Sequence, residues 1–261
     1  MTSNVILKEE NGVGIITLNR PDSLNALGPP VFRELSSIID QIDNSDNVRA
    51  VIITGAGKGF CSGGDVIGHP IFENKDPMVK EFDFKAAHNV TLGLQRLPKP
   101  VIAAVNGIAA GGGCDLAMAC DIRIASEKAR FSEIFARSGL MPDMGGSYLL
   151  PKLVGLGKAF EMIFTGEIID AEEALKIGLV NKVVPPEELM PAAMAMAKRF
   201  AEGPSLSYKY SKWAIYKGLS MGLEDALDNE LYGQSVLLET EDVKEAIKSF
   251  SEKRKPVFKG K

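Results

Sequence analysis

Apolar positions along the chain follow two spacings, one typical of buried strands and one typical of amphipathic helices. Short apolar runs bounded by turn residues predict strands at 5–9, 13–19, 48–54, 101–105, 121–125 and 129–132. Apolar residues three and four positions apart predict helices at 29–42 and 79–97. Because strands and helices alternate as far as about residue 135, the first half of the chain is predicted to form an α/β domain.

Helical spacing dominates from about residue 145 onward, and glycines and prolines interrupt it. Segment 186–202 carries a stripe of alanine and methionine, which favours packing in the core or at a subunit interface. Segment 223–250 is amphipathic and charged. Residues 66–78, with two prolines, a histidine and mixed charge, predict a mobile loop.

Composition narrows the class of protein. Of the 261 residues, 45% are apolar and 25% are charged, which is ordinary for a globular enzyme. The formal net charge of −4 argues against nucleic-acid binding, and no apolar run approaches the roughly 20 residues of a membrane span. Three cysteines in apolar or glycine-rich contexts and no signal-peptide pattern lead us to expect a cytoplasmic protein with reduced thiols.

The segment 99–121 is the strongest sign of chemistry. The apolar run 101–105 ends at Asn106-Gly107, and three glycines at 111–113 then open a predicted helix. Bare backbone N–H groups at the start of a helix can hold negative charge on a ligand oxygen. Asp115 lies about one turn into that helix, close enough to exchange a proton with a ligand bound there.

A second glycine-rich loop, 55–65, also follows an apolar strand. Each loop by itself is compatible with a simple tight turn. Loops that follow parallel strands meet at the carboxyl ends of the strands, where ligands bind. One N–H group from each loop, 55–65 and 107–113, could therefore form an oxyanion hole with Asp65 and Asp115 nearby.

Other common site types lack their signatures. The glycines do not have dinucleotide-binding spacing, and no Gly-Lys-Ser/Thr follows either loop. His69 and His88 have no ligand-spaced cysteine or histidine beside them, so we expect no bound metal. Without a Gly-x-Ser-x-Gly elbow, a serine triad is also unsupported. Carboxylates are therefore the expected proton carriers.

Several ordered motifs resemble the enoyl-CoA hydratase/isomerase (crotonase) superfamily across nearly the whole chain. They lie at 19–27, 60–65, 99–121, 142–146, 165–180 and 252–256. The resemblance implies a spiral of ββα units at 1–195 and a helical oligomerisation region at 196–261. It also implies a homotrimer or homohexamer that acts on acyl-CoA thioesters without a metal or redox cofactor.

The resemblance assigns roles by motif position. The N–H groups of Gly64 and Gly112 are implied to hold the thioester carbonyl oxygen. Residues implied to grip the CoA adenine and pantetheine are Ser23, Leu24, Ala26, Gly64, Asp65, Val66 and Ile67. Two preorganised donors would stabilise the enolate that forms when a thioester loses its weakly acidic α-proton.

The chain departs from the hydratase pattern at both water-holding glutamates. Asp115 stands at the first position and is one methylene shorter, and Phe135 stands at the second and cannot carry a proton. Phe135 is instead expected to line a drier acyl pocket. Glu133 could compensate if the local backbone were shifted, but a solvated or salt-bridged residue at the end of a strand is the favoured interpretation.

Asp143 stands where many hydratases have glycine and where several isomerases of the superfamily have aspartate. A helix N-cap is the competing interpretation of this residue. We therefore predict an isomerase in which Asp143 shuttles a proton and Asp115 assists. A hydratase or dehydratase that uses Asp115 with Asp143 or Glu133 is the alternative. A non-catalytic acyl-CoA-binding or RNA-binding member of the fold is the third hypothesis.

Overall fold

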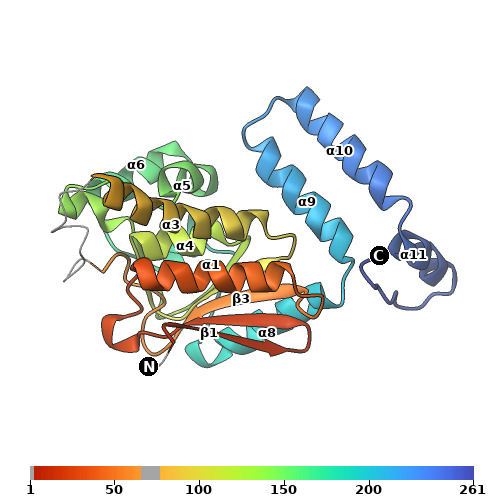
Figure 1. Ribbon diagram of the computed structural model, residues 1–261, viewed down its shortest axis with the longest axis horizontal. Coiled ribbons are helices and arrows are strands. Elements are labelled where there is room, and N and C mark those ends of the chain that lie inside the picture. The colour runs from red at the N-terminus through yellow and green to blue at the C-terminus, as the bar shows by residue number, and fades with distance from the viewer. Residues whose placement is uncertain (1–2, 66–76) are drawn as a thin grey trace.

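The computed structural model describes residues 3–65 and 77–261 (Figure 1). Most of the predicted loop 66–78, including the predicted ligand contacts Val66 and Ile67, lies outside the described residues. Its last two residues, 77 and 78, belong to a helix.

A six-stranded sheet forms the centre of the described structure. Its strands, in spatial order, are β1 (Val5–Glu10), β2 (Val13–Leu18), β3 (Ala50–Gly55), β4 (Val101–Val105), β6 (Ile122–Ser126) and β9 (Lys182–Val184). β1 and β2 form the predicted antiparallel hairpin, and every other pair is parallel. The strand β9 was not predicted, because three residues are too few to show a period.

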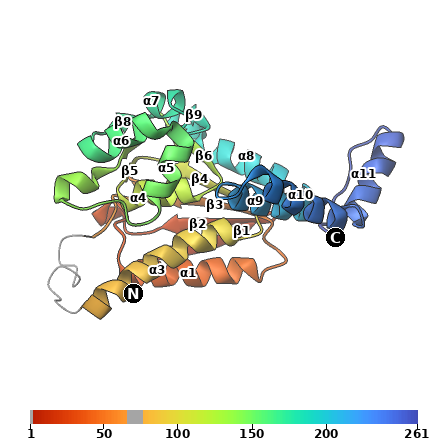
Figure 2. The same cartoon turned by 90° about the horizontal axis from the view of Figure 1, so that it is seen from above.

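The two faces of this sheet support separate apolar layers. Val51, Ile53 and Ala103 pack on the side covered by α1 (Pro29–Asp43) and α3 (Pro77–Arg96). Ile52 and Ile102, which alternate with them, pack on the other side against α8 (Leu189–Ala201). Figure 2 shows α1 and α3 on one side of the sheet and α8 on the other.

The alanine stripe of segment 186–202 packs against this sheet. Ala193, Ala197 and Ala201 on α8 are buried in the same cluster as Ile52. The stripe is therefore core packing, one of the two predicted roles. The predicted boundary at 195/196 falls inside α8, and Ala193, Ala197 and Ala201 lie in the sheet's apolar cluster on both sides of it.

A smaller three-stranded sheet lies beside the first. Its strands are β7 (Arg130–Ser132), flanked by β5 (Ile108–Ala110) in parallel and β8 (Ile169–Asp170) in antiparallel. Helices α4 (Gly112–Ala119), α5 (Gly146–Val154), α6 (Leu156–Thr165) and α7 (Ala171–Lys176) surround it. β5 is important for the site, because it sets the position of the triple glycine that follows it.

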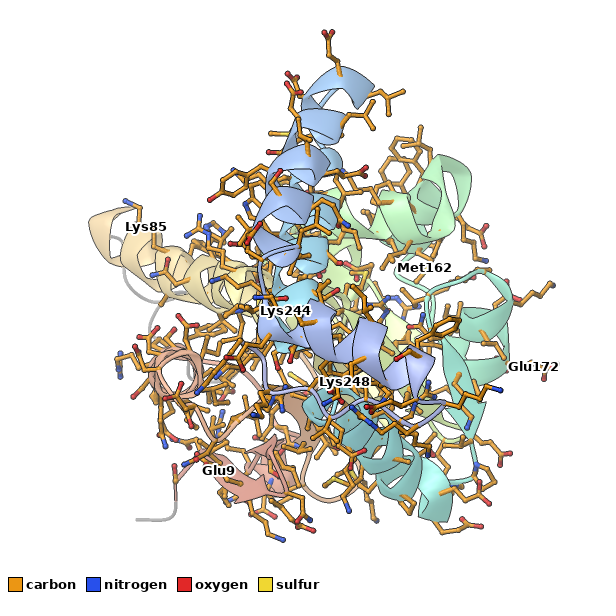
Figure 3. All side chains as sticks on the ribbon, turned by 90° about the vertical axis from the view of Figure 1, so that its right-hand side faces the viewer. Glu9, Lys85, Met162, Glu172, Lys244 and Lys248 are labelled. Atoms are coloured by element: carbon orange, nitrogen blue, oxygen red, sulfur yellow. The ribbon has the colours of Figure 1, made fainter. Side chains whose placement is uncertain are left out.

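Three helices extend away from this body in Figure 1: α9 (Ser205–Gly218), α10 (Leu223–Leu237) and α11 (Glu241–Ser251). A buried network ties α9 to the core, in which Lys212 Nζ and Tyr216 Oη contact the carboxylate of Asp121 at 2.8 and 2.9 Å. Figure 3 looks onto α11, where Lys244 and Lys248 lie. No helix among the described residues is long and apolar enough to cross a membrane.

Candidate active site

The two glycine loops meet, as predicted, and a short stretch of backbone pairing joins them. Cys61 forms an isolated bridge with Ala109, and the N–H of Ala110 donates to the Cys61 carbonyl at 3.0 Å. The backbones approach so closely at Gly113 that an added Cβ would collide with the Cys61 carbonyl oxygen. Glycine is required there for a steric reason, independent of any ligand.

Gly64 and Gly112 lie on either side of this junction. Gly112 is the first residue of α4, so its N–H has no partner within the helix. The N–H of Gly64 is absent from the backbone hydrogen bonds made among the described residues. Gly63 connects the two positions, because a Cβ on it would lie 3.5 Å from the Gly112 nitrogen. The junction therefore offers two backbone donors, with open space beside Gly64.

The turn predicted to grip CoA is fastened to the first loop. The hydroxyl of Ser62 donates to the Ser23 carbonyl at 3.0 Å, and the N–H of Ser62 donates to the Leu24 carbonyl at 2.9 Å. One guanidinium nitrogen of Arg20 donates to the carbonyl of Ala26 at 2.7 Å, and the other donates to the carboxylate of Asp65 at 2.9 Å. Ser23, Leu24, Ala26 and Asp65 thus lie together beside Gly64.

Asn25 is a residue of this turn that the sequence reasoning missed as a positioning group. It is buried with a positive φ of 61°, and its amide donates to the carbonyls of Ala56 and Gly59 at 3.0 and 2.8 Å. Its Oδ1 accepts from the Arg20 N–H at 2.9 Å. The available signal was an asparagine, which tolerates a positive φ, in the turn between β2 and α1.

Asp115 lies on α4, one turn after Gly112, and is fully buried. Its Oδ2 accepts a hydrogen bond from the Met144 N–H at 3.1 Å, just before α5, while Oδ1 has no partner. Burial, with a smaller contribution from the charge of Asp143, raises the pKa of Asp115 to about 7, and the backbone donors of Met144 and Gly146 oppose this rise. Asp115 can therefore exchange protons near neutral pH.

Glu133 differs from its favoured interpretation. It was expected to be a solvated or salt-bridged residue, but its side chain is fully buried and neither carboxyl oxygen has a hydrogen-bond partner. It lies between β7 and the 3₁₀-helix η2 (Ile134–Ser138), directed toward Asp115. Burial, followed by the charge of Asp115, raises its pKa to about 9. The predicted exposure of Glu133 was wrong because the spacing of residues in the sequence does not reveal which face of a short strand is covered.

Asp143 lies in the loop before α5 and is only partly buried. Burial raises its pKa above the usual carboxyl value, and the charge of His88 on α3 opposes that shift. The N-cap of α5 is Gly145, with no side-chain cap bond, so the interpretation of Asp143 as the helix cap is wrong. His88, set aside as a metal ligand, instead belongs to the surroundings of this carboxylate.

Phe135 is 8% exposed and its ring reaches the second glycine loop. A Cβ on Gly111 would lie 3.6 Å from the Phe135 ring, and a Cβ on Gly112 would lie 3.1 Å from the Met144 sulfur and 3.4 Å from Leu27. Apolar groups therefore surround the end of α4 that carries the backbone donors. Such surroundings exclude water and strengthen electrostatic interactions.

Comparison with known proteins identifies the family. Residues 8–261 match the model of the family described as Enoyl-CoA hydratase/isomerase. The short-chain-enoyl-CoA hydratase of Clostridium acetobutylicum is 44% identical, covering 97% of this chain and 96% of that protein. The trans-2-decenoyl-[acyl-carrier-protein] isomerase of Streptococcus mutans is 35% identical, covering 98% of each. The crystal structure of the enoyl-CoA hydratase of Bacillus anthracis superposes with a TM-score of 0.94 at 35% identity, covering 99% of this chain and all of that one.

The fold and the junction of glycine loops define an α/β protein of the crotonase type. The chain belongs to the enoyl-CoA hydratase/isomerase family. It is accordingly an enzyme of the hydratase/isomerase type, which contradicts the hypothesis of a non-catalytic binding protein. The predicted fold class is confirmed.

Proposed function

We propose that this enzyme moves a double bond in an unsaturated acyl-CoA, with Asp143 as the proton carrier. The observation that carries the proposal is the arrangement of three acids and one phenylalanine. Asp115 and Glu133 are fully buried, Asp143 is partly exposed, and Phe135 fills the position of the second hydratase glutamate. A partly exposed acid with a raised pKa suits proton transfer on carbon.

In this mechanism the thioester oxygen accepts hydrogen bonds from the N–H groups of Gly64 and Gly112. These donors stabilise the enolate that forms when Asp143 removes a proton from the acyl chain. Asp143 then returns the proton to another carbon, which shifts the double bond. Asp115 assists by orienting the substrate or by proton transfer. The reaction consumes no water and needs no metal or redox cofactor.

The parts predicted to hold CoA support the same proposal. Ser23, Leu24, Ala26 and Asp65 surround Gly64, so a CoA gripped there would present its thioester to the two glycine donors. Val66 and Ile67 follow directly in the sequence and are proposed to extend this contact.

A hydratase or dehydratase is the second candidate function. One observation favours it: Asp115 and Glu133 form a buried pair of acids, which resembles two carboxyl groups around a water. Several relatives also carry the name hydratase, including that of Clostridium acetobutylicum. In this case Asp115 with Glu133 or Asp143 would activate the water.

Proton NMR of enoyl-CoA and dienoyl-CoA esters in heavy water tests the proposal. Deuterium at the α or γ carbon with a moved double bond, and no hydroxyl product, is expected. A new β-hydroxyl group, labelled when the reaction runs in heavy-oxygen water, would contradict the isomerase and support the hydratase. Ester binding with neither exchange nor hydration would contradict both.

We also propose that the chain assembles as a homotrimer or homohexamer. The helices beyond the core expose large apolar side chains, among them Leu223, Leu227 and Leu231 at 77%, 53% and 68%, which lie four residues apart on α10. Side chains of this size are normally covered by a partner when they lie close together. Light scattering on the purified protein should give three or six times the mass of 28.1 kDa, and a monomer would contradict the proposal.

A further inference from the structure

Glu133 is the buried group for which the proposed isomerisation has no use. A Cβ placed on Gly146 would lie 3.0 Å from the carboxyl carbon of Asp115 and 3.0 Å from Oε2 of Glu133. The two carboxyl groups therefore face each other across a position that only glycine leaves free. Three of their four oxygens have no hydrogen-bond partner.

Within the described part of the chain, no positively charged group lowers the pKa of Asp115 or Glu133 directly. Cys114 on α4 places a thiol beside Glu133. Asp143 in the loop before α5 adds a third acid, and the charge of His88 on α3 acts on Asp143. Two negative charges this close in a buried site repel strongly, so both carboxyl groups cannot be ionised at neutral pH.

Backbone hydrogen bonds determine which of the two carboxyl groups, Asp115 or Glu133, ionises first. Asp115 accepts the Met144 N–H and lies at the N-terminus of α5, with the Gly146 nitrogen also favouring its charged form. No backbone group among the described residues donates to Glu133, and the Cys114 thiol beside it is a weak donor. Negative charge therefore settles on Asp115, and the proton stays on Glu133.

We infer that Glu133 is a positioning residue of a coupled pair: Asp115 is the group that ionises, and its charge keeps the proton on Glu133, so that a neutral acid stays against Asp115 at neutral pH. The inference rests on the proposed function only in giving Asp115 a use in proton transfer. The pair titrates in two steps: Asp115 loses its proton while Glu133 is neutral, and the charge on Asp115 then raises the pKa of Glu133. The raised pKa values of Asp115, about 7, and Glu133, about 9, agree with this arrangement.

Carbon-13 NMR of the carboxyl groups, followed through a pH titration of the substrate-free protein, tests the inference. Asp115→Asn assigns the Asp115 resonance. Glu133→Gln, which keeps the shape of the side chain and cannot ionise, assigns the Glu133 resonance, and Asp115→Asn is also the test variant. The matched control is Glu172→Gln, an exposed glutamate on α7 at the edge of the molecule in Figure 3.

In Asp115→Asn the pKa of Glu133 should fall by at least one unit, a tenfold change in its ratio of acid to carboxylate, because the charge of Asp115 is gone. The control should leave it unchanged. In Glu133→Gln the pKa of Asp115 should change much less, because Glu133 is already neutral when Asp115 ionises. A Glu133 pKa that stays the same in Asp115→Asn would overturn the inference.

Activity gives a second, separate readout. The acidic limb of the pH profile of kcat should stay at the wild-type pH in Glu133→Gln, since Glu133 is neutral when Asp115 ionises, and a large shift would contradict the inference. If Glu133→Gln does not fold, the wild-type titration still decides. The inference is overturned if neither buried carboxyl group titrates above about pH 6, well beyond the ordinary value near 4. Because the titration uses no substrate, failure of the proposed isomerisation leaves its result intact.

Discussion

The backbone N–H of Met144 donates to the carboxylate of Asp115 at 3.1 Å, which joins the loop before α5 to helix α4. The N-cap residue of α5, Gly145, supplies no side-chain cap. Asp115 therefore supplies negative charge at the start of α5 while it faces Glu133. Because Asp115 has both roles, changes near Gly146 should affect both the stability of the protein and proton transfer.

Replacing the carboxylate of Asp143 should stop proton transfer while leaving binding intact. We expect Asp143→Asn to lower kcat by about 10²–10⁴-fold, the range for loss of a general acid–base group, because an amide cannot accept the proton. KM for the acyl-CoA ester should change little. Asp40→Asn, on the exposed side of α1, is the control. Steady-state kinetics measure both, and unchanged turnover in Asp143→Asn would remove Asp143 from the mechanism.

Stability should fall as the pH rises. Asp115 and Glu133 have raised pKa values in the folded protein, about 7 and about 9, against 3.8 and 4.5 for the free groups. Above about pH 4 the folded state therefore holds protons that the unfolded chain has released. By linkage, each such proton lowers the free energy of unfolding by up to about 1.4 kcal/mol for each unit of rising pH.

Urea unfolding at fixed protein concentration, from about pH 5 to about pH 8, measures this slope. Glu133→Gln should make the decline shallower, since it removes one of the two groups. Glu172→Gln is again the control. A free energy of unfolding that rises steadily over this range would contradict the prediction.

The apolar pattern was sufficient to predict the main elements and their order. The hairpin at Asn11-Gly12, the strand before the triple glycine and the helix over 29–42 are all present. These elements succeed because long, strongly periodic segments bury one face, and burial is what the pattern records. Strands of two or three residues, such as β5 and β8, were missed because so short a run shows no period.

The site was predictable where backbone sets its geometry and not where side-chain burial does. Glycine loops follow strands, so the meeting of 55–65 with 107–113 follows from the order of elements. The burial of Glu133 depends instead on Gly146, which lies 13 residues further along the chain and leaves room for two carboxyl groups. Sequence spacing contains no such information about packing between distant segments.

Lys212 should hold α9 on the core. Its ammonium group donates to the carbonyls of Leu94 and Lys99 and to the carboxylate of Asp121, at 2.8, 3.1 and 2.8 Å. Lys212→Met leaves Asp121 with the Val101 N–H and the Tyr216 hydroxyl as donors, so we expect a loss of about 1.5–3 kcal/mol, the range for a hydrogen bond to a charged group. Lys209→Met, an exposed change on the same helix, is the control. Urea unfolding and faster hydrogen exchange in α9 measure the effect, and equal stability of the two variants would contradict it.

Adding one methyl group at Gly146 should disturb the carboxyl pair directly. A Cβ there would collide with Oδ1 of Asp115 and lie 3.0 Å from Oε2 of Glu133, both held in a packed interior. We expect Gly146→Ala to destabilise the protein by about 1–3 kcal/mol, as overpacking does, and to turn Asp115 away from the Met144 N–H. Gly157→Ala in α6 is the matched control, because its Cβ meets nothing within 4 Å, and it should stabilise the helix by about 0.4–1 kcal/mol. Urea unfolding of both variants gives the comparison.

Because a rotated Asp115 loses its backbone donor, its pKa should rise in Gly146→Ala, and the same carbon-13 titration should detect that rise. Equal stability of the two alanine variants would show that the carboxyl pair can move aside, and would contradict the close packing on which this prediction depends.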